Sequence, residues 1–273
     1  MKVCFIGGGN MAAAMIAGMV NHGYDGQDVI VFDRNEDKRE NLVSRYEIRS
    51  SDSLLESIAI ADIIILAVKP QGMISLIRDI RDHTRDDQTI VTVAAGIKTN
   101  DYERMFAKNI SFARTIPNTP SSLGYGATGI FFNKNISDDD KLEVINIMKT
   151  MGEVAVVEKE DEIDVIAAIA SSGPAYYFQF MEHMVNAAVK RGLDKQQAEK
   201  LVAQTCLGAA QMALKSDKDM ATLRENVTSK KGITFEALCI FEKFDLGGII
   251  DDAIQANITR AGQLAQEFSS EIS

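Results

Sequence analysis

Cysteine is scarce in this chain, and its scarcity narrows the classes of protein to consider. The three cysteines, Cys4, Cys206 and Cys239, are far apart and odd in number. They cannot form a disulfide framework or a zinc site, because both need paired or closely spaced cysteines. We therefore expect three reduced thiols in a cytoplasmic protein, and no bound metal.

Long apolar runs and clusters of basic residues are also missing. The most apolar stretch, Ile60–Val68, contains Asp62 and is about half as long as a membrane-spanning helix. The apolar run from Val3 is too short for a signal peptide and leads into three glycines. The 29 Lys and Arg residues are scattered, and 39 Asp and Glu residues give a formal net charge of -10. These features argue against a membrane or a nucleic acid as the partner.

The first 160 residues alternate between strand-like and helix-like segments. Apolar strands are expected at residues 3–7, 29–33, 62–68, 89–96, 110–116, 127–132 and 153–158. Continuous apolar strands are typical of a parallel sheet that helices cover on both faces. We therefore predict a Rossmann-like, doubly wound α/β domain over residues 1–160.

Residues 161–273 show helical patterns only. Helices are expected at 164–172, 174–191 and 195–216, followed by two more after a polar loop at 228–234, the last over 249–268. Asp194 and Gln197 resemble a capping box at the start of the third of these helices. About 110 helical residues make a thin core, so we expect an all-α dimerisation domain that packs against a second copy.

Three glycines follow the first predicted strand and open a helix. Gly7-x-Gly9-x-x-Ala12 is typical of a loop whose backbone approaches a pyrophosphate at a helix N-terminus. Asp33 ends the second strand, about 20 residues beyond the glycines, where a residue that binds the ribose 2′-hydroxyl is expected. Arg34 would instead attract a 2′-phosphate. The pattern predicts a dinucleotide site and leaves the choice of dinucleotide open; a glycine-rich turn without a ligand is the alternative.

Several segments, taken together and in this order, resemble one enzyme family. They are Ile6–Ala12 (IGGGNMA), Ala67–Gln71 (AVKPQ), Val93–Gly96 (VAAG), Arg114–Pro120 (RTIPNTP), Ser172–Tyr176 (SGPAY) and Asn226–Thr234 (NVTSKKGIT). The chain is similar in these segments to pyrroline-5-carboxylate reductases, which catalyse the last step of proline biosynthesis. The resemblance covers essentially the whole chain, and its PNTP and late-loop motifs are far more specific than the glycine pattern.

The resemblance implies transfer of a hydride to the C=N bond of 1-pyrroline-5-carboxylate, which gives L-proline. NADPH is the expected reductant and NADH the alternative. A homodimer is implied, alone or within a larger homo-oligomer, with the active site where the helical domain of one subunit meets the sheet domain of another. The cofactor residues that the family motifs imply are Gly7, Gly9, Asn10, Met11, Asp33, Arg34, Ala67, Val68, Lys69, Pro70, Ala95 and Gly96.

The late loop is implied to bind the substrate. Ser229, Gly232, Ile233 and Thr234 lie just before a helix predicted from Phe235, where backbone N–H groups suit a carboxylate. Thr234 is the candidate catalytic residue, because its hydroxyl can donate to the ring nitrogen and relay a proton from water. The alternative is that Thr234 only caps the next helix.

Asn118 and Lys231 each allow two interpretations. Asn118 lies between Pro117 and Pro120, so its amide is rigid enough to orient the carboxamide or the substrate; a simple proline-rich turn is the alternative. Lys231 and Ile233 replace a glycine and a threonine of the family loop. If that glycine has a positive φ, Lys231 is strained; otherwise its charge attracts the carboxylate or is merely solvated.

Two other classes of protein are alternatives. A β-hydroxyacid dehydrogenase would need a lysine base on the first helix after the sheet domain, but residues 172–189 contain no lysine. A non-enzymatic dinucleotide-binding regulator is favoured only by Lys231 and Ile233.

Overall fold

The computed structural model describes residues 1–272, which form two compact units. One unit contains Met1–Pro174 together with the chain from Ala256 onward, and the other contains Ala175–Gln255. The expected boundary at residue 160 therefore differs from the division in the structure. Ile163, Ala168 and Phe268 explain the difference, because all three are buried within the sheet unit although they lie in helical segments.

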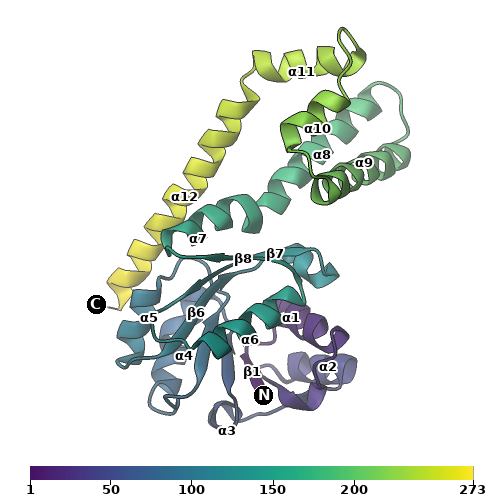
Figure 1. The fold of residues 1–273 in the computed structure, drawn as a ribbon. Coiled ribbons are helices and arrows are strands. Elements are labelled where there is room, and N and C mark those ends of the chain that lie inside the picture. Colours follow the sequence, from purple (N-terminus) through teal and green to yellow (C-terminus); the bar gives the residue numbers. More distant parts are fainter. Residues whose placement is uncertain (273) are drawn as a thin grey trace. The chain divides into compact units, whose positions relative to one another are not determined.

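The first unit is built on an eight-stranded sheet with the order β3-β2-β1-β4-β5-β6-β7-β8 (Figure 1). The strands are β1 (Val3–Ile6), β2 (Val29–Phe32), β3 (Arg49–Ser50), β4 (Ile63–Leu66), β5 (Thr89–Thr92), β6 (Ser111–Ile116), β7 (Gly126–Phe132) and β8 (Gly152–Val157). The doubly wound sheet is confirmed. However, β7 runs antiparallel to β6, since residues 117–125 are too few for the crossover that a parallel neighbour needs.

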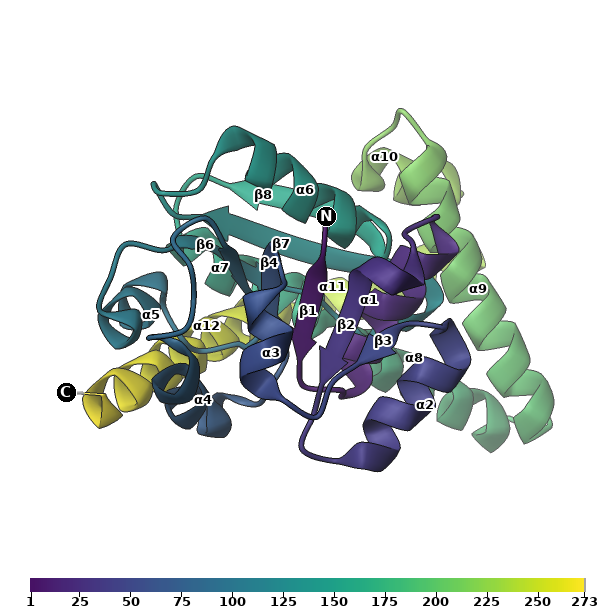
Figure 2. The same cartoon turned by 90° about the horizontal axis from the view of Figure 1, so that it is seen from below.

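Helices cover both faces of the sheet, which is why its strands are apolar on both sides. Along β1, Val3 and Phe5 pack into one core cluster, whereas Cys4 and Ile6 pack into the other. The first cluster takes residues from α1 (Asn10–Asn21), α2 (Glu36–Tyr46) and α6 (Asp138–Lys149), and the second from α3 (Leu54–Ala59), α4 (Met73–Ile80) and α5 (Thr99–Phe106). Figure 2 shows the same layers from a second direction. Burial raises the pKa of the Cys4 thiol to about 12, so this thiol is protonated and inert at neutral pH.

The rest of the described chain is helical. Its elements are α7 (Asp161–Ile166), a π-helical turn (Ala167–Ser171), α8 (Gly173–Lys190), α9 (Lys195–Lys215), α10 (Met220–Asn226), α11 (Ile233–Lys243) and α12 (Leu246–Glu271). The predicted Asp194 cap is confirmed, because its carboxylate accepts the Gln197 N–H at 3.0 Å. The expected end of one helix at residue 172 and start of the next at 174 are confirmed to within one residue, since Ser172 alone separates the π-helical turn from α8. α10 was not predicted.

None of the helices within residues 1–272 combines the length and the apolarity that crossing a membrane would require.

Candidate functional site

The glycine loop joins β1 to α1, and its glycines serve different purposes. Gly7 has φ +107°, and a Cβ there would lie 2.6 Å from the Ala67 carbonyl oxygen. Gly8 donates its N–H to a carboxylate oxygen of Asp33 at 2.7 Å. Gly9 has open space around it, because an added Cβ would meet no atom within 4 Å. Gly7 is therefore required by the fold, whereas Gly9 leaves its backbone accessible to a ligand.

The N-terminus of α1 is suited to an anion. Gly9 is its N-cap residue and provides no side-chain hydrogen bond to the first turn. Asn10 is exposed and Met11 half-buried. The first N–H groups of a helix lack intrahelical partners and carry partial positive charge, so this end of α1 favours a phosphate group.

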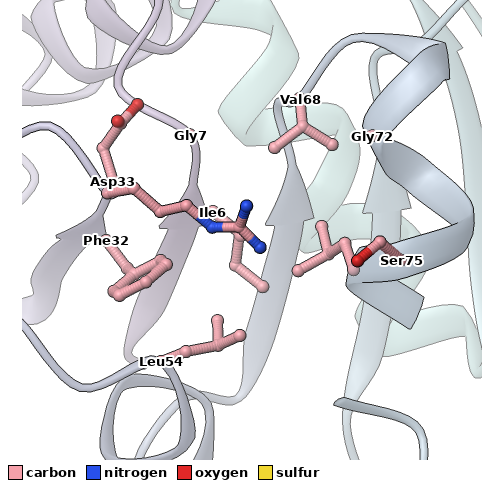
Figure 3. Close-up of a pocket in the computed structure, with 10 residues that line it drawn as sticks. Ile6, Gly7, Phe32, Asp33, Leu54, Val68, Gly72 and Ser75 are labelled. Atoms are coloured by element: carbon pink, nitrogen blue, oxygen red, sulfur yellow. The ribbon is translucent and has the colours of Figure 1, made fainter. Parts of the chain in front are cut away.

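A cavity of about 210 Å³ lies beside the glycine loop, where β1, β2 and β4 end (Figure 3). Phe32 and Leu54 lie on one side of it, and Val68 and Ser75 on the other. Its volume is below that of a pocket for a whole drug-sized ligand, and it suits one end of a dinucleotide. The full lining is Ile6, Gly7, Phe32, Asp33, Arg34, Leu54, Val68, Gly72, Ser75 and Leu76.

Asp33 and Arg34 have different surroundings in this cavity. The Asp33 carboxylate accepts the N–H of Gly8 at 2.7 Å and that of Asn35 at 2.9 Å, so both oxygens already brace the backbone. The Arg34 side chain is 81% exposed, with one terminal nitrogen 3.9 Å from an Asp79 oxygen. Arg34 is therefore free to turn toward a ligand, while Asp33 holds the glycine loop in place.

The segments after β4 and β5 border the same end of the sheet. Ala67 continues the sheet by donating its N–H to the Ile6 carbonyl at 2.8 Å. Lys69 is exposed and precedes the 3₁₀ turn Pro70–Gly72. After β5, Ala95 is exposed at the tip of a turn. Gly96 is buried with φ +74°, and a Cβ there would lie 3.3 Å from the Leu264 Cβ of α12.

Asn118 is fixed by two hydrogen bonds within the first unit. Its Oδ1 accepts the Ala127 N–H at 2.9 Å, and its Nδ2 donates to the Ala170 carbonyl at 3.0 Å. Pro174, four residues after Ala170, has no N–H to offer that carbonyl. The Asn118 amide therefore gives the Ala170 carbonyl the partner that an α-helical N–H at position 174 would otherwise supply. One Nδ2 hydrogen remains for another partner.

The late loop is tight and ends at α11. Lys231 has φ +55°, so the strain expected for a lysine at this glycine position is present. The cap of α11 is Gly232, and Thr234 is already the second residue of the helix. The helix thus begins two residues earlier than predicted, and the interpretation of Thr234 as the cap is wrong. Thr234 is half-buried, whereas the Ile233 side chain is 93% exposed.

The predicted site residues fall into two groups. The cofactor residues and Asn118 belong to the first unit, and Ser229, Gly232, Ile233 and Thr234 belong to the second. The sequence patterns did not point to Phe32, Leu54, Gly72, Ser75 or Leu76 of the cavity. The available signal was their position, since each lies at or after the carboxyl end of β2, β3 or β4. Among residues 1–272, no three His, Cys, Asp or Glu side chains are grouped to hold a metal ion.

The sheet topology and the glycine loop define a dinucleotide-binding protein of the Rossmann-like class with a helical C-terminal part. Residues 160–264 match the family model described as pyrroline-5-carboxylate reductase dimerisation. Residues 2–96 match the model described as NADP oxidoreductase, coenzyme F420-dependent.

Relatives and solved structures of one family extend over the whole chain. The pyrroline-5-carboxylate reductase of Vibrio alginolyticus is 37% identical over 268 residues, with 98% of each chain covered. The solved structure of a pyrroline-5-carboxylate reductase from Coxiella burnetii superposes with a TM-score of 0.93 at 36% identity, covering 97% of this chain and 98% of that one. The structure of Plasmodium falciparum pyrroline carboxylate reductase with NADP bound superposes with a TM-score of 0.86 at 27% identity, with the same coverage of both chains. The chain belongs to the pyrroline-5-carboxylate reductase family.

Proposed function

We propose that this protein reduces 1-pyrroline-5-carboxylate to L-proline with NAD(P)H. A hydride passes from C4 of the nicotinamide to the imine carbon, and the ring nitrogen carries or receives a proton. The observation that carries the proposal is the identity of 37% to a pyrroline-5-carboxylate reductase over 98% of both chains. The accessible glycine loop at Gly9 supplies the place that the pyrophosphate of the cofactor requires.

Thr234 is the proposed catalytic residue. A hydroxyl is a weak acid, so its contribution is to donate a hydrogen bond to the ring nitrogen and to relay a proton from water. Holding the imine carbon against the nicotinamide supplies much of the remaining acceleration. The position of Thr234 in the first turn of α11 gives the hydroxyl a rigid support.

The substrate carboxylate is proposed to bind at the N-terminus of α11. The backbone N–H group of Ile233 and the hydroxyl of Ser229 are the donors that we assign to it. The Gly232 N–H already donates to the Ser229 carbonyl at 2.9 Å, so Gly232 contributes as the N-cap that opens the helix toward the carboxylate. α11 has 11 residues, and the unpaired N–H groups of its first turn favour an anion. Ile233 can serve through its backbone although its side chain differs from the family threonine. Asn118 uses its remaining amide hydrogen toward the substrate or the carboxamide.

NADPH is the proposed reductant, with NADH as the weaker one. The Asp33 carboxylate is engaged by two backbone N–H groups, and the exposed Arg34 guanidinium is available for a 2′-phosphate. The NADP-bound structure of the Plasmodium falciparum relative supports the same choice. The segments Ala67–Pro70 and Ala95–Gly96 are proposed to approach the nicotinamide half.

A homodimer is the proposed assembly, with one chain supplying the sheet unit and the other the helical unit of each active site. The match of residues 160–264 to a dimerisation model supports it. So does the set of large apolar side chains that the helical unit exposes in the single chain: Leu201, Leu207, Met212, Leu214 and Met220. The reducing cytoplasm is the compartment that suits the free thiols Cys4, Cys206 and Cys239.

The direct test is steady-state reduction of 1-pyrroline-5-carboxylate with NADPH and NADH in parallel. Thr234→Ala is expected to lower kcat by about tenfold or more, as for a lost proton donor. Thr234→Ser keeps the hydroxyl and should retain most of the activity. Unchanged activity in Thr234→Ala would remove this residue from the mechanism. No activity of the unmodified protein with either nucleotide would favour the non-enzymatic regulator, and oxidation of a hydroxy acid would favour the dehydrogenase.

A further inference from the structure

Arg114 is a buried cation that the proposed function does not use. It lies in β6, and its side chain is only 3% exposed. One terminal nitrogen donates to Glu160 at 3.1 Å, and the other to Asp164 at 2.8 Å. A buried guanidinium needs such partners, because an unpaired charge in the interior is strongly destabilising. Arg114 thereby holds the Glu160 carboxylate in one place.

Glu160 uses the same oxygen to hold Thr99. The Oε1 atom accepts the Thr99 N–H at 2.7 Å and the Thr99 hydroxyl at 2.9 Å. Thr99 is the first residue of α5, and the N-cap residue Lys98 contributes no side-chain cap. Glu160, 61 residues away in the sequence, therefore does what a capping side chain would do and adds a negative charge at the positive end of the helix.

Thr99 ends the short segment that contains the Ala95–Gly96 turn. On the other side of this turn, the Thr92 hydroxyl accepts the Ala94 N–H at 3.2 Å and is hydrogen-bonded to the Tyr102 hydroxyl at 2.8 Å. The turn is thus fixed at both ends, by Thr92 before it and by the Glu160–Thr99 contact after it. Ala95, at its tip, is exposed toward solvent.

We propose that Arg114 and Glu160 are positioning residues. They fix the position of the Ala95–Gly96 backbone turn relative to the nicotinamide half of the cofactor. This inference rests on the proposed function, because that function places the nicotinamide at this turn. Neither side chain is assigned a contact with the cofactor. Their effect passes from Arg114 through Glu160 to the Thr99 backbone, and from there to the turn.

The test compares two ligands, NADPH and 2′,5′-ADP, which has only the adenosine half. Glu160→Ala is expected to weaken NADPH binding by about tenfold and to lower kcat, since a misplaced turn loses its alignment with the nicotinamide. Binding of 2′,5′-ADP should remain within about twofold, because its site lies at the ends of β1 and β2. Glu160→Gln keeps an acceptor oxygen for Thr99 and should restore most of the NADPH binding.

Two further variants complete the design. Asp161→Ala removes the neighbouring carboxylate, which is 85% exposed and contacts the Lys98 amine at 2.9 Å. This variant should bind both NADPH and 2′,5′-ADP as tightly as the unmodified protein. Thr99→Val removes only the hydroxyl contact to Glu160, so it stays folded even where Glu160→Ala does not. It should weaken the binding of NADPH and leave the binding of 2′,5′-ADP unchanged. Equal weakening of both ligands, or no change in NADPH binding, would overturn the inference. Because binding needs no turnover, a protein that binds NADPH without reducing the imine would overturn the proposed function only.

Discussion

Two glycines of one loop show how a single residue type serves two purposes. Gly7 has a positive φ and lies against the Ala67 carbonyl, so the fold itself excludes a side chain there. Gly9 has a φ of −77°, which any residue adopts, and the space around it is open. The first glycine maintains the structure, and the second leaves its backbone open at the place proposed for the pyrophosphate.

Replacing each glycine with alanine should separate these roles. Gly7→Ala is expected to lower the free energy of unfolding by about 2 kcal/mol or more, through strain and a backbone clash. Gly9→Ala should lower the free energy of unfolding by at most about 1 kcal/mol, because an N-cap position prefers glycine to alanine by about that amount. The same change should weaken NADPH binding at least about tenfold. Urea unfolding and fluorescence titration with NADPH measure the two effects. Equal destabilisation by both changes would contradict this division of roles.

Lys231 has a left-handed backbone that a lysine adopts only at a cost. That conformation disfavours a residue with a Cβ by about 1–2 kcal/mol, part of which glycine loses again through the entropy of the unfolded chain. Lys231→Gly should therefore raise the free energy of unfolding by about 0.5–1 kcal/mol, measured by urea denaturation. Lys230→Gly is the control, because Lys230 is not among the residues with positive φ. This change should therefore not raise the free energy of unfolding. A rise in KM for the imine in Lys231→Gly would assign its charge to the carboxylate.

Among the elements, the π-helical turn depends most on a distant side chain. Ala167–Ser171 connects α7 to α8, and Pro174 deprives the Ala170 carbonyl of its normal partner. The Asn118 amide supplies that partner and also accepts the Ala127 N–H at the start of β7. One side chain thus joins a turn after β6, a sheet strand and a helical segment.

Asn118→Ala should be destabilising for this reason. It leaves the half-buried Ala127 N–H and Ala170 carbonyl without partners, which we expect to lower the free energy of unfolding by about 1–3 kcal/mol. In Asn118→Asp the side chain still accepts the Ala127 N–H but cannot donate to the Ala170 carbonyl. The decrease in the free energy of unfolding should therefore be smaller than for Asn118→Ala. Ser171→Ala removes only a 3.5 Å contact to the Pro117 carbonyl and is the control. Full stability of Asn118→Ala, with an impaired KM for the imine, would make this amide a substrate contact alone.

At the scale of the whole molecule, the proposed dimer accounts for the apolar side chains that the helical unit exposes in the single chain. Leu207 and Leu214 lie seven residues apart on α9, on the same face, and are 50% and 76% exposed. Burying an exposed leucine side chain contributes about 1.5–3 kcal/mol of favourable free energy, so an interface formed on this face of α9 would stabilise a dimer.

Charges on this face should break the assembly. The double change Leu207→Asp and Leu214→Asp is expected to give a monomer in light scattering after size-exclusion chromatography and to abolish imine reduction. Leu123→Asp, at a side chain of the sheet unit that is 76% exposed, should leave the assembly intact. A double variant that keeps the native mass would show that this face is not the interface.

The sequence by itself determined most of the strands and helices and the glycine loop of this protein. The apolar runs gave the main strands, and Gly7 and Gly9 marked the loop, because periodicity and backbone freedom are local properties of the chain. It missed the two-residue β3 and the seven-residue α10, which are too short to carry a periodic pattern.

Only the tertiary structure decided which distant groups meet. It directed both Asp33 oxygens to backbone N–H groups, gave Asn118 the carbonyl that Pro174 leaves unpaired, and set Glu160 at the start of α5. These partners lie 52 and 61 residues apart in the latter two cases, so no local pattern encodes them. Hydrogen-bond partners are chosen by which segments pack together, and a buried polar group must find one wherever the fold provides it.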